Sequence, residues 1–166
     1  RAEKLHNLFV FCNTQATTEL VKSLNPDIIV NATGSEPTLP PIRGLHDLVD
    51  KEDSHVATVL KMIERIPEYP EHMEGRKVVI IGGGAVGLDV MEFFTERGAR
   101  VSMVEMLPMI GNGLDPVSRC DIHAKLKKYQ VEQMVNTMLQ EVRNDRFIVK
   151  TPQDEIKELP FDYGFI

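Results

Sequence analysis

Cysteine is scarce in this chain, because its 166 residues include only Cys12 and Cys120. Two cysteines so far apart exclude a secreted disulfide framework, a site built from four cysteines and a close-spaced redox disulfide. Basic residues are outnumbered: 19 Lys and Arg stand against 25 Asp and Glu, which gives a formal net charge of -6. A protein that holds nucleic acid electrostatically needs the opposite sign. We therefore expect no nucleic-acid partner.

Long apolar runs are also missing. Runs such as Val78–Ile81 are far shorter than the about 20 residues that a membrane helix needs, and no signal peptide is visible. The chain is 42% hydrophobic and 27% charged, which is ordinary for a globular protein. We expect a cytoplasmic protein with no membrane partner. The apolar run Asp162–Ile166 stops before any turn-forming residue, so we also expect a piece of a longer polypeptide.

The beginning of the chain has the pattern of a strand, a helix and a second strand. Leu8–Cys12 and Asp27–Asn31 are short apolar runs, typical of buried strands. Between them, Thr17 or Thr18 can cap a short helix that reaches Lys22.

A linker and one helix are expected next. The second run leads into Ala32-Thr33-Gly34, and three prolines (Pro37, Pro40 and Pro41) then indicate an extended linker as far as Gly44. Within residues 45–75, apolar residues at helical spacing predict one face of a helix: Val56, Val59, Leu60, Ile63 and Ile66. The acidic residues Asp50, Glu52 and Asp53 precede His55. Such a cluster is more often the solvated start of a helix than a metal site, and we expect no metal.

The most regular part of the chain is a strand–helix–strand unit. Lys77–Ile81 has the pattern of a buried parallel strand, and Arg100–Glu105 that of a second strand. The helix between them should pack one face that contains Val86, Val90, Met91 and Phe94, and should end near Gly98 with a left-handed cap. The crossover should be right-handed.

The remainder predicts one helix and then strands. Asp115 and Pro116 have the pattern of an N-cap and a first helical residue, and Ile122, Leu126 and Tyr129 should share a face. Strands are expected over residues 137–143, 146–151 and 156–159, with another beginning at Phe161. The predicted fold class is α/β, with a Rossmann-like parallel sheet flanked by helices and a three-stranded β-meander.

Three glycines after the first strand of the regular unit match the spacing G-x-G-x-x-G: Gly82, Gly84 and Gly87. The first permits a tight turn, the second lets the backbone approach a pyrophosphate, and the third permits close packing of helix on strand. The start of the helix then offers free N–H groups and the positive end of the helix dipole. A glycine turn without a ligand is the alternative, but the flanking strand and helix favour dinucleotide binding.

Glu105 ends the second strand, 18 positions after Gly87. A carboxylate about 20 residues beyond the glycines can bind the ribose hydroxyls of the adenosine. It would repel a 2′-phosphate, and Met106–Ile110 supply no positive charge, so we expect NAD rather than NADP. A solvent-facing residue at the strand end is the alternative for Glu105. Asp89 either complements the helix dipole or forms a hydrogen bond near the nicotinamide side.

No catalytic constellation is visible among the cysteines, histidines and methionines. The residues around the motif form the expected cofactor-binding set: Gly82, Gly83, Gly84, Ala85, Val86, Gly87, Glu105 and Met106.

The order of these motifs resembles a known family. The run Asp27–Gly34, the proline-rich linker and the glycines from Gly82 to Gly87 resemble the flavoprotein reductases with two dinucleotide-binding domains. More closely, they resemble the C-terminal region of NADH:flavin oxidoreductases related to 2,4-dienoyl-CoA reductase and trimethylamine dehydrogenase. Thr18–Val21 before Asn25-Pro26-Asp27, and Gly87-Leu88-Asp89, have the same character.

The resemblance implies a division of the chain. Residues 1–44 would be the C-terminal part of an FAD-type domain, with Thr33 and Gly34 at its cofactor-binding end. Residues 45–75 would be a linker with one helix, and residues 76–166 an NAD(P)-binding domain. The glycine motif would then bind NAD(P)H rather than FAD.

The resemblance also implies a parent enzyme that passes hydride from NADH to a flavin. Its FAD, FMN and iron–sulfur cluster would be carried by parts not in this chain, so the remainder of that polypeptide, a barrel and an FAD domain, is an expected partner. In one branch of the family the equivalent domain holds ADP. A non-catalytic module that binds ADP or NAD is therefore a second hypothesis, and a fragment without a ligand is a third. Whether the chain forms a homo-oligomer stays open.

Overall fold

The structure is a computed structural model that describes residues 7–34 and 38–166. The chain divides into two compact units, Arg1–Glu36 and Pro37–Ile166. Among the described residues, no helix combines the length and the apolar content needed to span a bilayer.

The first unit contains the expected helix but not the expected strands. Helix α1 spans Thr18–Ser23, and the Thr17 hydroxyl caps it by accepting a hydrogen bond from the Leu20 N–H at 3.2 Å. Leu8–Cys12 and Asp27–Asn31 are not strands, and Phe9 and Val30 are 80% and 83% exposed. A strand needs a hydrogen-bonded neighbour, and over residues 7–34 the chain forms no sheet. The apolar pattern was therefore not sufficient to predict strands.

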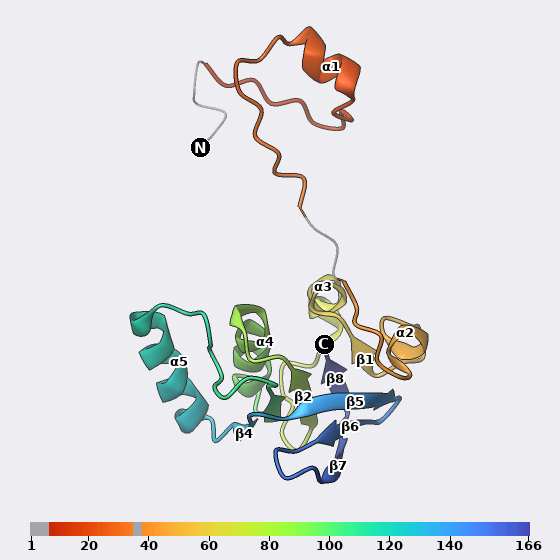
Figure 1. Cartoon of the computed structure of the whole chain (residues 1–166), viewed down its shortest axis with the longest axis vertical. Helices are drawn as coiled ribbons and strands as arrows, with labels where there is room; N and C mark the ends of the chain where they lie inside the picture. The colour runs from red at the N-terminus through yellow and green to blue at the C-terminus, as the bar shows by residue number, and fades with distance from the viewer. Residues whose placement is uncertain (1–6, 35–37) are drawn as a thin grey trace. The chain divides into compact units, whose positions relative to one another are not determined.

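A parallel sheet of five strands forms the centre of the second unit (Figure 1). Its strand order is β1-β8-β2-β3-β4, and every neighbouring pair is parallel. The strands are β1 (Val56–Ala57), β2 (Lys77–Ile81), β3 (Arg100–Val104), β4 (Glu132–Met134) and β8 (Tyr163–Phe165). Strand β2 pairs with β3 over five positions, from Lys77 opposite Arg100 to Ile81 opposite Val104. The Rossmann-like fold predicted from the sequence is confirmed.

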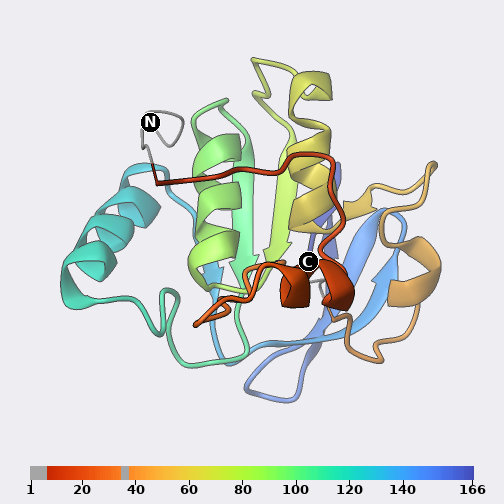
Figure 2. The same cartoon turned by 90° about the horizontal axis from the view of Figure 1, so that it is seen from above.

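Alternate residues of β2 enter two separate hydrophobic clusters, which makes the unit three layers thick. Val78 and Ile80 pack with the helices, whereas Val79 packs with the three-stranded sheet. The helices on the first face are α3 (Val59–Glu64), α4 (Ala85–Thr95) and α5 (Pro116–Lys128), which lie side by side (Figure 2). Burial on both faces explains why β2 is apolar throughout instead of alternating.

Helix α4 contributes most to the helix-side core. It buries Leu88, Val90, Met91 and Phe94, and the Phe94 ring stacks on Phe165 of β8 with centroids 4.9 Å apart. Val86, which the sequence pattern placed on the buried face, is 57% exposed. It lies in the first turn of the helix. The expected left-handed residue Gly98 is present with φ +86°.

The start of α5 is capped as predicted. The Asp115 carboxylate accepts hydrogen bonds from the Val117 and Ser118 N–H groups at 2.9 and 3.1 Å and from the Ser118 hydroxyl. The hydroxyl of Ser118, followed by the backbone N–H groups, lowers the pKa of Asp115. Leu126 is buried, and Ile122 and Tyr129 pack against the same cluster.

The predicted β-meander forms the third layer. It consists of β5 (Met138–Arg143), β6 (Arg146–Lys150) and β7 (Ile156–Pro160), paired antiparallel. Phe147 and Val149 of β6 face the parallel sheet and are fully buried. The short helix α2 (Leu45–Leu48) packs Leu45 into the same cluster.

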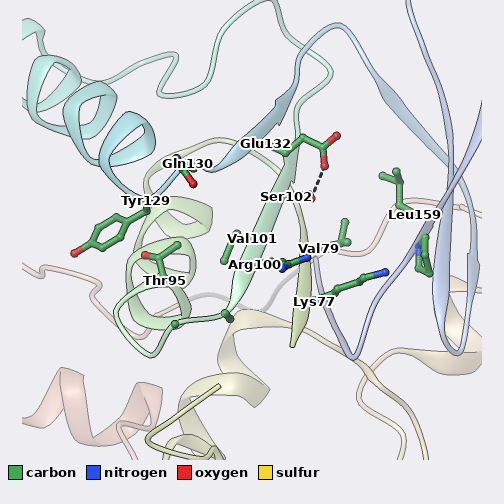
Figure 3. Close-up of a pocket in the computed structure, with 13 residues that line it drawn as sticks. Lys77, Val79, Thr95, Arg100, Val101, Ser102, Tyr129, Gln130, Glu132 and Leu159 are labelled. Atoms are coloured by element: carbon green, nitrogen blue, oxygen red, sulfur yellow. Dashed lines mark hydrogen bonds between the residues drawn. The ribbon is translucent and has the colours of Figure 1, made fainter. Parts of the chain in front are cut away.

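The meander leaves the amino ends of β2 and β3 uncovered. A cleft of about 680 Å³ lies there, between the sheet and Leu159 of β7 (Figure 3). Lys77 and Arg100 line one part of it, and the Ser102 hydroxyl donates to the Glu132 carboxylate at 2.7 Å in another. Polar and apolar side chains both line the cleft, which lies at the opposite end of the strands from the glycine turn.

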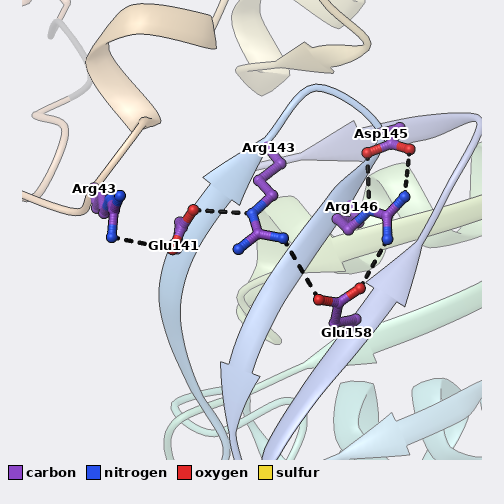
Figure 4. A network of polar contacts seen from close by, with 6 residues as sticks. All are labelled: Arg43, Glu141, Arg143, Asp145, Arg146 and Glu158. Atoms are coloured by element: carbon purple, nitrogen blue, oxygen red, sulfur yellow. Dashed lines mark hydrogen bonds and ion pairs between the residues drawn. The ribbon is translucent and has the colours of Figure 1, made fainter.

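Charged side chains form a continuous network on the meander (Figure 4). Arg146 donates to Asp145 through two nitrogens, at 2.9 and 2.8 Å, and to Glu158 of the next strand at 2.7 Å. Arg143 joins Glu141 at 2.9 Å and Glu158 at 3.5 Å. These contacts lower the pKa of Asp145 and raise the pKa of Arg146. The network connects all three strands and favours one register.

The strand expected from Phe161 is present as β8, which inserts between β1 and β2 of the parallel sheet. Two expectations for the rest of this unit were wrong. Val56 belongs to β1 and not to a helix. Helix α3 buries Met62, whereas Leu60 and Ile63 are 52% and 54% exposed, so the predicted apolar face is not the buried one.

Asp162, just before β8, accepts hydrogen bonds from residues at the start of β2. These contacts make the stability of the fold depend on pH. The Asp162 carboxylate accepts from the Lys77 N–H at 2.8 Å and from Arg76 at 2.9 Å. The backbone hydrogen bond from Lys77, followed by the contact with Arg76, lowers the pKa of Asp162. The ionised form is thus stabilised by folding, and this contribution is present at neutral pH and lost as the pH falls below about 3.9.

We predict that Asp162→Asn lowers the free energy of unfolding at pH 7 by about 0.5–1 kcal/mol, at the low end because the side chain is 34% exposed. Urea unfolding at pH 7 and pH 3 measures the difference, which should shrink at pH 3. Asp47→Asn, at an exposed position of α2, is the matched control. An equal loss at both pH values would contradict the assigned role of the carboxylate.

Candidate functional site

The glycine turn joins the carboxyl end of β2 to α4. Gly82 has φ +107°, in the region where only glycine is unstrained, and its N–H donates to the Val104 carbonyl at 2.8 Å. The turn is therefore tied to the carboxyl end of β3. Ligands of open parallel α/β sheets bind at this edge.

Close packing explains the third glycine of the motif. A Cβ at Gly87 would strike the Gly82 carbonyl oxygen and would lie 3.5 Å from Ile80 Cγ2. The first turn of α4 can therefore lie directly over the end of β2 only without a side chain at this position. The second glycine differs, because a Cβ on Gly84 would meet no protein atom within 4 Å. Gly84 thus faces open space, where its missing side chain leaves room for a ligand.

The start of α4 presents backbone N–H groups to that space. Gly84 is the N-cap and supplies no side-chain cap, so the first N–H groups of the helix have no partner within the helix itself. The positive end of the helix dipole adds to their attraction for an anion. These features together favour a phosphate group.

Glu105 lies beside the turn, immediately after β3. It is 8% exposed, and one carboxylate oxygen accepts from the Gly83 N–H at 2.7 Å while the other accepts from the Leu107 N–H at 2.8 Å. Each oxygen has a second lone pair for a further donor. The alternative expected from sequence, a solvent-facing strand end, is therefore wrong. The carboxylate points back to the glycine turn.

Exposed apolar side chains flank this carboxylate and the helix start. Val86, Met106 and Leu107 are 57%, 62% and 40% exposed. They come from the first turn of α4 and from the segment after β3, the two elements that carry the glycines and Glu105. An apolar ring system bound near Glu105 would find apolar contacts there.

The structure places eight of the ten expected cofactor-binding residues in this one region: Gly82, Gly83, Gly84, Ala85, Val86, Gly87, Glu105 and Met106. The other two lie in the first unit, where Gly34 has φ +86° and the Thr33 N–H donates to the Asn31 side chain at 3.2 Å. Asp89 is an exposed residue of α4.

Sequence reasoning missed the part played by the segment between β3 and α5. The Leu107 N–H holds Glu105, and the Gly111 N–H donates to the Gly83 carbonyl at 2.7 Å. Gly111 and Gly113 both have positive φ, +76° and +90°. Two glycines so close together were the available signal for a tightly folded loop.

Asp50, the first residue of the acidic cluster before α3, has a structural role. Both oxygens of Asp50 accept from Thr58, from its N–H at 2.7 Å and its hydroxyl at 2.8 Å. Over residues 7–34 and 38–166, no three His, Cys, Asp or Glu side chains are grouped in a way that could hold a metal ion.

Comparison with known proteins identifies the family. The model of the family described as pyridine nucleotide-disulphide oxidoreductase matches residues 10–166. A curated NADH oxidase from Thermoanaerobacter brockii is 32% identical over 127 residues, which are 76% of this chain and 18% of that protein. A bilirubin reductase from Mediterraneibacter gnavus is 28% identical over 148 residues, which are 89% of this chain and 21% of that protein.

A solved structure supports the same assignment. A 2-naphthoyl-CoA reductase in complex with 2-naphthoyl-CoA matches 92% of this chain and 22% of its own chain, with 25% identity and a TM-score of 0.72. The chain therefore spans only about a fifth of the length of these relatives.

The packing of Gly87 against Gly82 generates a stability prediction. We expect Gly87→Ala to lower the free energy of unfolding by about 1–3 kcal/mol, because the added methyl must displace α4 from the end of β2. Gly84→Ala is the matched control, because its methyl meets no protein atom and its φ is -78°. Urea unfolding measures both. Equal stability of the two variants would contradict this packing.

Proposed function

We propose that this chain binds NAD(H) at the turn between β2 and α4. The chain belongs to the pyridine nucleotide-disulphide oxidoreductase family, whose model matches residues 10–166. The observation that supports the proposal is that one backbone feature and one side-chain feature lie next to each other at this turn. The free N–H groups at the start of α4 suit a diphosphate, and the Glu105 carboxylate beside them suits the ribose hydroxyls. The proposed NAD(H)-binding set is Gly82, Gly83, Gly84, Ala85, Val86, Gly87, Glu105 and Met106, whereas Thr33 and Gly34 would belong to the cofactor-binding end of the FAD-type domain.

A preference for NADH over NADPH follows from Glu105. The carboxylate is held on both oxygens and 8% exposed, so it cannot turn away from a ligand at the glycine turn. A 2′-phosphate there would place like charges together in a partly dehydrated site, which is unfavourable. Met106–Ile110 contain no basic side chain that could compensate.

In the parent enzyme, this module would hold NADH so that it transfers hydride to a flavin. The redox chemistry belongs to the cofactors, and the protein supplies binding and orientation. We propose that residues 1–44 are part of an FAD-type domain, residues 45–75 a linker and residues 76–166 the NAD(P)-binding domain. FAD, FMN and an iron–sulfur cluster would be bound by parts of the parent outside this chain, and a cytoplasmic location suits such an enzyme.

The proposed parent is an NADH:flavin oxidoreductase similar to 2,4-dienoyl-CoA reductase, with an enone, an enoyl-CoA or a similar compound as electron acceptor. The names of several relatives agree with an organic acceptor: a bilirubin reductase, a cinnamate reductase from Clostridium sporogenes and the 2-naphthoyl-CoA reductase. Relatives named NADH oxidase favour a different acceptor within the same family.

A non-catalytic module that binds ADP or NAD is the second candidate. The glycine turn and Glu105 would contact only the diphosphate and the adenosine ribose, which ADP also contains. These contacts alone do not require a nicotinamide. Equal affinity for ADP and NADH would favour this candidate.

Gly84→Ala tests the site. We predict that it weakens binding of NADH at least about tenfold, because the methyl group enters the space open to the diphosphate. Isothermal titration calorimetry with NADH and ADP measures the loss, and urea unfolding checks that the fold is retained. Undiminished NADH binding by the folded variant would place the nucleotide elsewhere.

Glu105→Gln tests the selectivity. Removing the charge while keeping the size should reduce the preference for NADH over NADPH at least about tenfold, because the repulsion of the 2′-phosphate is lost. Glu132→Gln, at the exposed start of β4, is the matched control and should leave the ratio unchanged. If wild-type protein prefers NADPH, the assignment of Glu105 is wrong.

A further inference from the structure

We infer that Gly83, a position that the G-x-G-x-x-G pattern leaves free, is a positioning residue that holds Glu105 and so sets the selectivity between NADH and NADPH. This inference rests on the proposed function and adds to it a residue outside the three motif glycines.

Both the N–H and the carbonyl group of Gly83 form hydrogen bonds. Its N–H donates to the Glu105 carboxylate at 2.7 Å, and its carbonyl accepts from the Gly111 N–H at 2.7 Å. Both partners belong to the segment that follows β3. Gly83 thus joins the turn that would bind the diphosphate to the segment that would bind the ribose.

The space around Gly83 is already filled. A Cβ there would lie 2.6 Å from Ile110 Cδ1, 3.2 Å from the carboxylate oxygen Glu105 Oε2 and 3.3 Å from Glu105 Cβ. Ile110 is 1% exposed and part of the helix-side core, so it has little room to move. Any side chain at Gly83 must therefore push on Ile110, on Glu105 or on both.

Gly83 and Gly84 thus act on different parts of the ligand. A methyl group on Gly84 meets no protein atom and would meet the diphosphate, which NADH and NADPH share. A methyl group on Gly83 is directed at the carboxylate that distinguishes the two ribose groups. Alanine at Gly84 should therefore lower the affinity for both nucleotides, whereas alanine at Gly83 should change the selectivity between them.

The experiment compares Gly83→Ala with Gly84→Ala in the 166-residue chain. Calorimetric Kd values for NADH and NADPH should show that Gly84→Ala weakens both by a similar factor. Gly83→Ala should instead reduce the ratio of the NADPH Kd to the NADH Kd at least about fivefold. An unchanged ratio in Gly83→Ala would overturn the inference.

A second variant guards against a simple folding defect. Ile110→Val removes the Cδ1 atom that the new methyl would strike, so Gly83→Ala/Ile110→Val should recover stability in urea unfolding. Its Kd ratio should stay low, because the contact with Glu105 remains. Ile110→Val alone should keep the wild-type ratio. Recovery of the wild-type ratio in the double variant would assign the effect to core packing and overturn the positioning role.

Hydrogen exchange of the wild-type protein gives a readout that needs no ligand. The amides of Gly83, Leu107 and Gly111 should all be protected, and rapid exchange of any of them would also overturn the inference. Failure of the proposed function is distinguishable, because wild-type protein would then bind neither nucleotide. Wild-type binding of both nucleotides with equal Kd would remove the selectivity that Gly83 is inferred to set, and would overturn the inference while leaving the diphosphate site intact.

Discussion

The contact between Gly87 of α4 and the Gly82 carbonyl at the end of β2 is the constraint on which the site depends. Because no Cβ fits between them, the first turn of the helix lies directly over the carboxyl edge of the parallel sheet. The N–H groups that a helix leaves without partners then point into the space beside Gly84. In the proposed site, the attraction for a diphosphate would come from backbone N–H groups that packing holds in place, in a chain whose net charge is -6.

The sheet that supports this turn is assembled from distant pieces of the chain. Strand β8 lies between β1 and β2, and Val56 is paired with Gly164 across more than a hundred residues of sequence. Gly164 lies under two aromatic rings, because a Cβ there would be 2.7 Å from both Phe147 and Phe161. The aromatic rings of Phe147 and Phe161 therefore pack closely on β8, which neighbours β2 in the parallel sheet.

Local signals were sufficient to predict the part of the fold that carries the site. The apolar run Lys77–Ile81, the glycine spacing and the Asp115 cap each act within a few residues of the chain, and the structure contains all three. Strands β1 and β4 have two and three residues and exist through their partners, so no local pattern predicted them. Leu8–Cys12 shows the converse error, in which an apolar pattern predicts a strand that has no neighbouring strand within residues 7–34.

The same distinction explains what was predictable in the site. The position of Glu105 followed from its distance to the glycines along the chain, but its orientation depends on hydrogen bonds from the Leu107 N–H and the Gly83 N–H. Every dinucleotide contains a diphosphate. Backbone groups that bind the diphosphate therefore provide affinity but do not distinguish one dinucleotide from another. Discrimination requires one charge fixed at one point, and a carboxylate can be fixed only by groups that surround it. In the proposed site, the residues that would determine selectivity therefore include neighbours that the ligand would not touch, and a motif defined by ligand contacts does not contain them.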